Sequence, residues 1–195
     1  MDAKDPKSKS FNRNLTFVRD LTVAGTCVQY LAYNSTIPFL IVKDFRKREY
    51  YKDRSYRWGV CYDGSDLSKK ALRQACLMMS PQDKIVIITV QEEIVNSKTV
   101  HADLDAIAAE HGVKKIEKML LPFTKGMTVY KTIQAFLMSQ AIEGDDGIAH
   151  DYIDYVAVGN TGLGFDPKTH EATYLGSVAG AILRAKRMNC LFIPS

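Results

Sequence analysis

The sequence predicts a three-layer α/β/α sandwich, in which helices cover both faces of a parallel sheet. Three observations predict this fold class. Short β-rich segments alternate with segments of helical periodicity from residue 57 to residue 195. One β-rich segment, residues 84–90, is apolar nearly throughout, as expected of a strand that is covered on both faces. Repeated strand–helix–strand units favour right-handed crossovers between parallel strands.

The first predicted strand, residues 58–62, ends at Asp63-Gly64-Ser65, and Asp63, Ser65 and Asp66 are all suitable caps for a following helix. Apolar residues then recur at helical spacing, which predicts a helix with one buried stripe. The stripe consists of Leu67, Ala71, Leu72, Ala75, Met78 and Met79.

The second strand, residues 84–90, precedes a helix that should stop at Gly112 and is marked by Leu104, Ile107, Ala108 and His111. The third strand, residues 115–121, carries Lys118, so we expect it at an edge of the sheet. The next helix is marked by Val129, Ile133, Phe136, Leu137 and Ile142. A fourth strand (152–158) and a last strand (190–193) enclose a helix that passes through Val178, Ala181, Ile182 and Ala185.

The composition is that of an ordinary globular protein, with 195 residues, 46% hydrophobic and 25% charged. The net charge of +4 comes from residues 43–57, which hold seven Lys/Arg and three Asp/Glu. We interpret this segment as a solvated connector, anchored by Tyr50, Tyr51 and Tyr56, and not as a nucleic-acid site. No apolar run is long enough to span a membrane, so no membrane partner is expected.

Cysteine and histidine usage favours a reduced, cytoplasmic protein without a metal site. The four cysteines, Cys27, Cys61, Cys76 and Cys190, are scattered, and no histidine stands at ligand spacing from them. Cys61 and Cys190 lie in apolar runs, where a thiol packs as a small hydrophobic group.

The N-terminal segment contains an internal repeat of the last helix and strand. When Gly25 is set against Gly176 without gaps, Gly25-Thr26 aligns with Gly176-Ser177, and residues 40–42 align with residues 191–193. We therefore divide the chain into a partial helix–strand unit (1–43), a basic linker (44–57) and a complete domain (58–195). Chance alignment of two apolar helix–strand units is the alternative.

Three stretches should meet beyond the carboxyl ends of the strands, where ligands bind in open parallel sheets. They are residues 62–65, residues 89–91 and residues 158–164, and the helix that begins at Gly176-Ser177 joins them. Glycines let main-chain N–H groups approach phosphate oxygens, and a helix start adds free donors. Adenine could bind the main chain at Val90, and Asp63 could accept from a ribose hydroxyl. The alternative is that the glycines form ordinary turns and Asp63 caps a helix.

Residues 58–195 resemble a complete domain of the universal stress protein family. The resemblance rests on residues 60–65 (VCYDGS), 154–162 (DYVAVGNTG), 175–178 (LGSV) and 189–193 (NCLFI). ATP-binding members of that family carry the pattern G-x2-G-x9-G-[ST], and Gly159, Gly162, Gly176 and Ser177 match its residue types.

The resemblance implies a five-stranded parallel sheet of order 3-2-1-4-5, as in adenine nucleotide alpha hydrolase-like folds, and an ATP or AMP ligand with Mg²⁺. It implies these nucleotide-binding residues: Cys61, Tyr62, Asp63, Val90, Val158, Gly159, Gly162, Gly176, Ser177 and Val178. One departure is that thirteen residues, not nine, separate Gly162 from Gly176. The longer loop could bulge outward, or it could bring Lys168 or His170 against a phosphate.

Two functions follow as hypotheses. One is an adenine-nucleotide-binding regulatory module in the stress response, with at most slow hydrolysis, because no general base is evident. The other is an interaction or dimerisation module with a vestigial pocket. A nucleotide-alpha hydrolase or ligase is disfavoured, because residues 62–66 do not match an SGGxDS-type loop.

The resemblance also bears on the partial unit. In this family the last strand commonly pairs antiparallel with its counterpart in a second subunit. We therefore expect residues 37–42 to lie antiparallel beside residues 190–193, with the helix at residues 26–33 packed over the join. The pairing could occur within one chain or be swapped between two chains of a homodimer.

Overall fold

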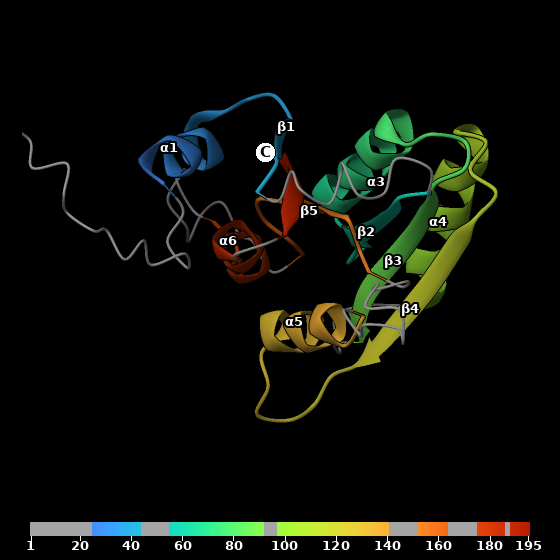
Figure 1. Cartoon of the computed structure of the whole chain (residues 1–195). Coiled ribbons are helices and arrows are strands. Elements are labelled where there is room, and N and C mark those ends of the chain that lie inside the picture. The colour runs from blue at the N-terminus through green and yellow to red at the C-terminus, as the bar shows by residue number, and fades with distance from the viewer. Residues whose placement is uncertain (1–24, 44–54, 92–96, 141–151, 164–174, 186–187) are drawn as a thin grey trace, which may run out of the picture.

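The computed structural model describes residues 25–43, 55–91, 97–140, 152–163, 175–185 and 188–195. In this part of the chain the strands form one six-stranded sheet of order β1-β6-β5-β2-β3-β4 (Figure 1). The strands are β1 (Phe39–Ile41), β2 (Arg57–Cys61), β3 (Lys84–Gln91), β4 (Ile116–Pro122), β5 (Tyr155–Gly159) and β6 (Asn189–Ile193). The helices are α1 (Thr26–Asn34), α3 (Asp66–Met78), α4 (Ser97–Glu110), α5 (Val129–Ser139) and α6 (Ser177–Arg184).

The five strands β2 to β6 are parallel, and the sequence-based prediction of the fold class is confirmed. Counted along the chain from β2, their order in the sheet is 3-2-1-4-5, as expected. Strand β4, which carries Lys118, forms one edge of the sheet, as predicted. The strand order reverses between β2 and β5, so the sheet has a topological switch point there.

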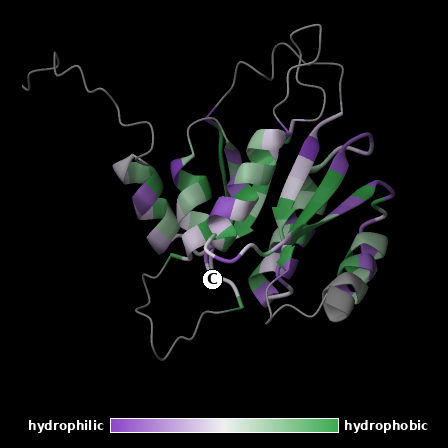
Figure 2. Ribbon diagram, turned by 90° about the horizontal axis from the view of Figure 1, so that it is seen from below, coloured by the Kyte–Doolittle hydropathy of each residue, from purple (hydrophilic) through white to green (hydrophobic). Residues whose placement is uncertain are grey.

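Apolar side chains form one cluster on each face of the sheet. One cluster lies under α3 and α4 and contains Ile85 and Ile87, whereas the other lies under α5 and α6 and contains Val86 and Ile88. Successive residues of a strand point to opposite faces. This alternation explains why β3 is apolar at nearly every position. Figure 2 shows the resulting concentration of hydrophobic residues in the central strands.

Capping residues set the helix boundaries, and the sequence predicts two of them, Ser65 and Gly112. The Ser65 hydroxyl accepts a hydrogen bond from the Ser68 N–H (3.2 Å) and caps α3. After α4, Gly112 adopts a φ of 66°, a left-handed conformation that ends the helix at little cost to glycine. Thr128 caps α5 by accepting from the Lys131 N–H (3.3 Å).

Residues 25–43, called here the N-terminal unit, pair with the last strand as predicted. Strand β1 lies antiparallel to β6, and Leu40 is directly opposite Leu191. The two repeats also begin alike, because Gly25 caps α1 and Gly176 caps α6 with nearly the same backbone angles (φ −57°, ψ 155° and φ −57°, ψ 151°). Helix α1 packs over the join through Ala32, which is 2% exposed and belongs to the apolar cluster under α5 and α6.

The prediction that residues 43–57 are a solvated connector is wrong at both ends. Lys43 is half-buried, and its ammonium donates hydrogen bonds to three carbonyl oxygens at the end of α6. Arg57 is the first residue of β2, is 6% exposed and forms an ion pair with Glu117 (2.9 Å). Both cations can leave water because each finds oxygen acceptors, Lys43 at the end of α6 and Arg57 on β4.

Between these ends, Tyr56 anchors the segment as expected. Its ring meets Tyr155 edge-on, with the centroids 5.8 Å apart. Residues 44–54, including Tyr50 and Tyr51, lie outside the described residues.

All four cysteines are free thiols. Cys76 and Cys190 are buried, Cys61 is half-buried, and Cys27 is exposed on α1. Within the described ranges, no helix has the length and apolar character needed to cross a membrane.

Candidate functional site

The candidate site lies at the carboxyl ends of β2, β3 and β5, beside the N-terminus of α6. These elements adjoin the point where the strand order reverses. Helices α3 and α6 cover opposite faces of the sheet, so the loops that lead into them diverge from this point. Divergent loops at a switch point leave an opening at the sheet edge, and ligands of open α/β sheets bind there.

The carboxylate of Asp63 joins the loop after β2 to the loop after β5. One oxygen accepts a hydrogen bond from the Ser65 N–H (3.0 Å), and the other accepts from the Leu163 N–H (2.9 Å). The second bond connects segments that are 100 residues apart in sequence. Asp63 is therefore fixed at the junction of the two loops, with lone pairs left over, because a carboxylate offers about four acceptor positions.

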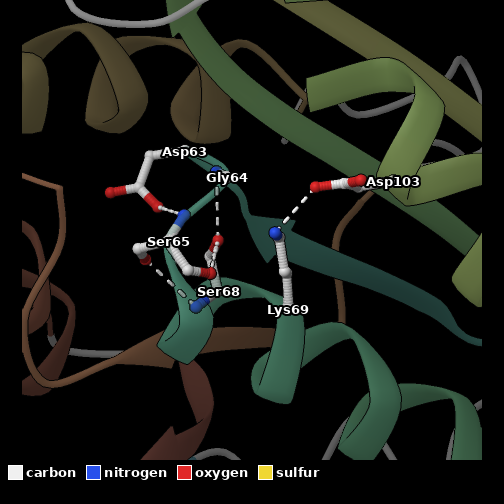
Figure 3. A network of polar contacts seen from close by, with 6 residues as sticks. All are labelled: Asp63, Gly64, Ser65, Ser68, Lys69 and Asp103. Atoms are coloured by element: carbon white, nitrogen blue, oxygen red, sulfur yellow. Dashed lines mark hydrogen bonds and ion pairs between the residues drawn. The ribbon is translucent and has the colours of Figure 1, made fainter. Parts of the chain in front are cut away.

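The turn that carries Asp63 is held by a small network of hydrogen bonds (Figure 3). Gly64 adopts a φ of 86°, which favours glycine, and its N–H donates to the Ser68 hydroxyl (3.1 Å). That hydroxyl donates in turn to the Ser65 carbonyl oxygen (2.9 Å). One turn further along α3, Lys69 forms an ion pair with Asp103 of α4 (2.7 Å). The turn is thus tied to α3, and α3 to α4.

One glycine of the predicted phosphate loop, Gly159, also has a packing role. A Cβ at Gly159 would lie only 2.8 Å from the Cβ of Leu67. Gly159 thus lets the first turn of α3 approach β5. Its missing side chain is explained by packing within the protein.

Gly162 and Gly176 stand at close approaches inside the site itself. A Cβ at Gly162 would lie 2.5 Å from a carboxylate oxygen of Asp63. A Cβ at Gly176 would lie 3.1 Å from the main-chain oxygen of Asn160, which accepts a hydrogen bond from the Gly176 N–H (2.7 Å). Both glycines therefore hold the loop after β5 against its neighbours.

Asn160 is a site residue that the sequence reasoning did not single out. It is 8% exposed, its N–H donates to Ile193 (2.9 Å), and its amide nitrogen donates to the hydroxyl of Ser195 (3.2 Å). Its side-chain oxygen has no hydrogen-bond partner among the described residues. Together with its carbonyl contact to Gly176, Asn160 joins the ends of β5 and β6 to the start of α6. The available signal was a polar residue between two glycines directly after a buried strand.

The N-terminus of α6 offers hydrogen-bond donors to the site. The first N–H groups of a helix have no intrahelical partner, and the helix dipole makes this end favourable for an anion. Ser177 is exposed and Val178 is half-buried, so the predicted hydroxyl and main-chain donors lie at the surface. The eight residues of α6 make a helix long enough to carry a dipole.

Val90 is placed so that its main chain could meet a planar ligand. The Tyr62 N–H donates to the Ile88 carbonyl oxygen (2.9 Å), so Ile88 directs its main-chain groups toward β2. Residues two apart in a strand face the same neighbour, and Val90 therefore faces the same way. The pairing of β2 with β3 ends at Cys61 and Ile88, two residues before Val90. The side chain of Val90 itself is buried under α5 and α6.

The side chains of the remaining predicted residues pack in the core, which leaves their main-chain groups as the candidates for contact with a ligand. Tyr62 is 2% exposed under α3 and α4, and its carbonyl oxygen accepts from the Thr89 hydroxyl (2.8 Å). Burial, with the negative charge of Asp103 adding to it, raises the pKa of Tyr62 to about 12. Val158 and Cys61 pack on the opposite face. Burial also raises the pKa of the Cys61 thiol, which keeps it neutral.

The residues between Gly162 and Gly176 that could reach a phosphate, Lys168 and His170, lie outside the described residues. Among the described residues, no three His, Cys, Asp or Glu side chains cluster as metal ligands. Magnesium usually keeps several waters and is bound through one or two carboxylates and the phosphates of a nucleotide. Asp63 is the carboxylate that fits this role here.

The fold and the site define an open, doubly wound α/β protein with a polar junction at its switch point. No protein-family model matches the chain, and no curated protein matches it. Among solved structures, the chain is similar to a universal stress protein in complex with cAMP, at 20% identity, covering 72% of this chain and 98% of that chain, with a TM-score of 0.48. It is also similar to protein Rv1636 from Mycobacterium tuberculosis H37Rv, at 19% identity, covering 73% of this chain and 98% of that chain, with a TM-score of 0.45.

Proposed function

We propose that this chain binds an adenine nucleotide, ATP or AMP, and acts as a regulatory module of the universal stress protein type. The bound nucleotide would place its base at the main chain of Val90 and its ribose near Asp63. Its phosphates would lie between the loop after β5 and the N-terminus of α6. This placement uses the motif residues of the sequence and the geometry of the switch point.

The observation that carries the proposal is the bond between the Leu163 N–H and Asp63. It holds the loop after β5 against the turn after β2 at 2.9 Å, and it sets a carboxylate beside main-chain donors. Anions bind well at exposed N–H groups near a helix start, whereas a ribose hydroxyl needs an acceptor. Both kinds of group stand at this junction.

We expect at most slow hydrolysis of ATP. Both oxygens of Asp63 already accept main-chain hydrogen bonds, so this carboxylate is held as a binding group. A general base must hold an attacking water and take its proton, whereas the two N–H donors hold Asp63 to the loops.

The second candidate, an interaction module with a vestigial pocket, is favoured by a different observation. A Cβ at Gly159 would clash with Leu67, and Cβ atoms at Gly162 and Gly176 would press against Asp63 and Asn160. Internal packing alone would therefore retain all three glycines without a ligand.

Calorimetric titration with MgATP and with AMP separates the two candidates. Nucleotide binding predicts micromolar affinity, which corresponds to about 8 kcal/mol. Asp63→Asn should weaken it at least about 10-fold, because a hydrogen bond to a charged group contributes roughly 1.5–3 kcal/mol. Asp66→Asn is the matched control, since Asp66 is an exposed carboxylate in the first turn of α3. This variant should bind nucleotide with the affinity of the wild type.

Nucleotide that copurifies gives an independent measurement. Protein purified without added nucleotide is heat-denatured, and the supernatant is analysed by ion-exchange chromatography. ATP or AMP at close to one equivalent supports binding. No heat signal with either nucleotide, together with an empty supernatant, would favour the interaction module.

A further inference from the structure

Lys43 is the last described residue of the N-terminal unit, and it closes the end of α6. Its ammonium donates hydrogen bonds to the carbonyl oxygens of Ile182 (3.0 Å), Leu183 (2.6 Å) and Ala185 (2.9 Å). Its main-chain N–H donates to the side-chain oxygen of Asn189 (2.8 Å). One residue of the N-terminal unit therefore contacts both α6 and the first residue of β6.

These contacts supply hydrogen-bond donors to carbonyl groups at the end of the helix. The last carbonyl groups of an α-helix have no intrahelical donor, and this end carries the negative pole of the dipole. A lysine ammonium supplies both a positive charge and three donors. Burial lowers the pKa of Lys43, which indicates that the ammonium has exchanged water for these carbonyl groups.

The other end of the same helix lies in the candidate site. Helix α6 has eight residues, so its two ends are about 12 Å apart. At its start, the Gly176 N–H is bonded to the Asn160 carbonyl oxygen at 2.7 Å. Between the ends, Ala179, Ile182 and Leu183 are packed in the apolar cluster to which Ala32 of α1 also belongs. A short, tightly packed helix moves as one body.

We infer that Lys43 is a positioning residue for the nucleotide site, acting through α6, and that docking of the N-terminal unit is coupled to nucleotide binding. The inference rests on the proposed function. When the N-terminal unit is docked, α6 is held with its N-terminus against the loop after β5. When the unit is released, α6 loses its C-terminal donors, and the apolar cluster of α6 loses Ala32 of α1.

Coupling between two sites is reciprocal. If docking improves the affinity for nucleotide, bound nucleotide must stabilise docking by the same factor. Each direction gives a separate measurement, and both can be made on the full chain.

The first measurement is calorimetric titration with MgATP of the wild type, Lys43→Met, Lys43→Arg and Ile107→Val. Lys43→Met should weaken binding roughly 3- to 10-fold, within the range for residues that transmit coupling without touching the ligand. Lys43→Arg keeps the charge and should recover part of the affinity. Ile107→Val loses a buried methyl group in α4, on the opposite face of the sheet, and controls for general loss of stability. Its affinity should equal that of the wild type.

The second measurement is the rate at which Cys190 reacts with a thiol reagent, read by peptide mass spectrometry. Cys190 is buried and lies opposite Ile41 of β1, whereas Cys76 is buried under the other face. Release of the N-terminal unit should expose Cys190 alone. We expect Lys43→Met to speed the labelling of Cys190 and leave Cys76 unchanged. MgATP should slow the labelling of Cys190 in the wild type more than that of Cys76, which reports global unfolding.

The outcomes separate this inference from the proposed function. If MgATP binds the wild type and Lys43→Met equally well, and slows Cys190 and Cys76 labelling alike, the coupling is refuted while nucleotide binding stands. If neither MgATP nor AMP binds the wild type, the proposed function and the coupling are both refuted. The inference is also overturned if Lys43→Met lowers the affinity for MgATP, relative to the wild type, no more than Ile107→Val does.

Discussion

Leu40 of β1 lies directly opposite Leu191 of β6, and Leu191 is also the residue with which Leu40 aligns in the internal repeat. Its neighbours on either side are exchanged: Phe39, which aligns with Cys190 in the repeat, pairs with Phe192, and Ile41, which aligns with Phe192, pairs with Cys190. A residue that faces its own counterpart marks a local two-fold axis. Self-complementary pairing of this kind is the geometry of a two-fold dimer interface. The N-terminal unit thus takes, within one chain, the place that a second copy of α6 and β6 would take.

Deletion of residues 1–43 should cause self-association. It would leave β6, a strand that is buried at every position, with its outer main-chain N–H and C=O groups unpaired. Such edge strands pair with other chains. Sedimentation or light scattering measures the result, and the melting temperature should fall. Deletion of residues 1–24 is the control, because it keeps the N-terminal unit. A 1–43 deletion that retains the association state and the melting temperature of the full chain would show that β1 is dispensable.

A matched pair of glycines tests the phosphate-binding end of α6. Gly25 and Gly176 cap their helices with nearly the same backbone angles, but a Cβ at Gly25 would meet nothing within 4 Å, whereas one at Gly176 would lie 3.1 Å from Asn160. Gly176→Ala should therefore push the loop after β5 away and weaken MgATP binding about 10-fold. Gly25→Ala should leave the affinity unchanged. Equal titration curves for both variants would show that the start of α6 does not hold the phosphates.

The fold could be predicted from the sequence more completely than the roles of single residues. Periodicity and capping residues were enough for the helices and strands of residues 58–195, because these depend on patterns that extend over many positions. The sheet order came from the family resemblance, and the position of β1 came from the internal repeat together with that resemblance. The packing role of Gly159 could not be predicted, because its partner, Leu67, is a distant residue whose approach only the packed structure reveals. Lys43 was assigned to solvent because a charge run is usually solvated, and its acceptors are the carbonyl oxygens at the end of a helix that lies far along the chain. Asn160 was passed over because an amide between glycines carries no motif of its own.

Gly159→Ala should destabilise the fold. The new Cβ would lie 2.8 Å from the Leu67 Cβ, and neither the helix start nor the buried strand β5 can yield without moving its neighbours. Overpacking of this kind costs typically 1–3 kcal/mol. Urea unfolding monitored by the fluorescence of Trp58, the only tryptophan, measures the loss. Gly25→Ala is again the control. A free energy of unfolding equal to that of the wild type would mean that α3 can shift freely against β5.

Tyr62→Phe should make the fold less sensitive to alkaline pH. Burial raises the pKa of Tyr62 from 10 to about 12, so as the pH rises the unfolded chain loses this proton before the folded chain does. The tyrosine therefore stabilises the fold fully below pH 10, and this contribution is lost between pH 10 and about pH 12. The buried hydroxyl has no hydrogen-bond partner among the described residues, so its removal should cost little or stabilise at pH 8.

The free energy of unfolding of Tyr62→Phe, taken relative to that of the wild type, should be about 1 kcal/mol higher at pH 11 than at pH 8. The size follows because one unit of pKa corresponds to about 1.4 kcal/mol. Urea unfolding at both pH values measures the difference. Burial raises the pKa of Cys190 as well, to about 12, so the comparison must be made between variants and not between pH values alone. Tyr30→Phe is the matched control, because Tyr30 is exposed on α1 and its replacement should give the same pH dependence as the wild type. If Tyr62→Phe and Tyr30→Phe respond alike, the Tyr62 phenol is in contact with water and the packing of α3 and α4 over it is looser than the structure indicates.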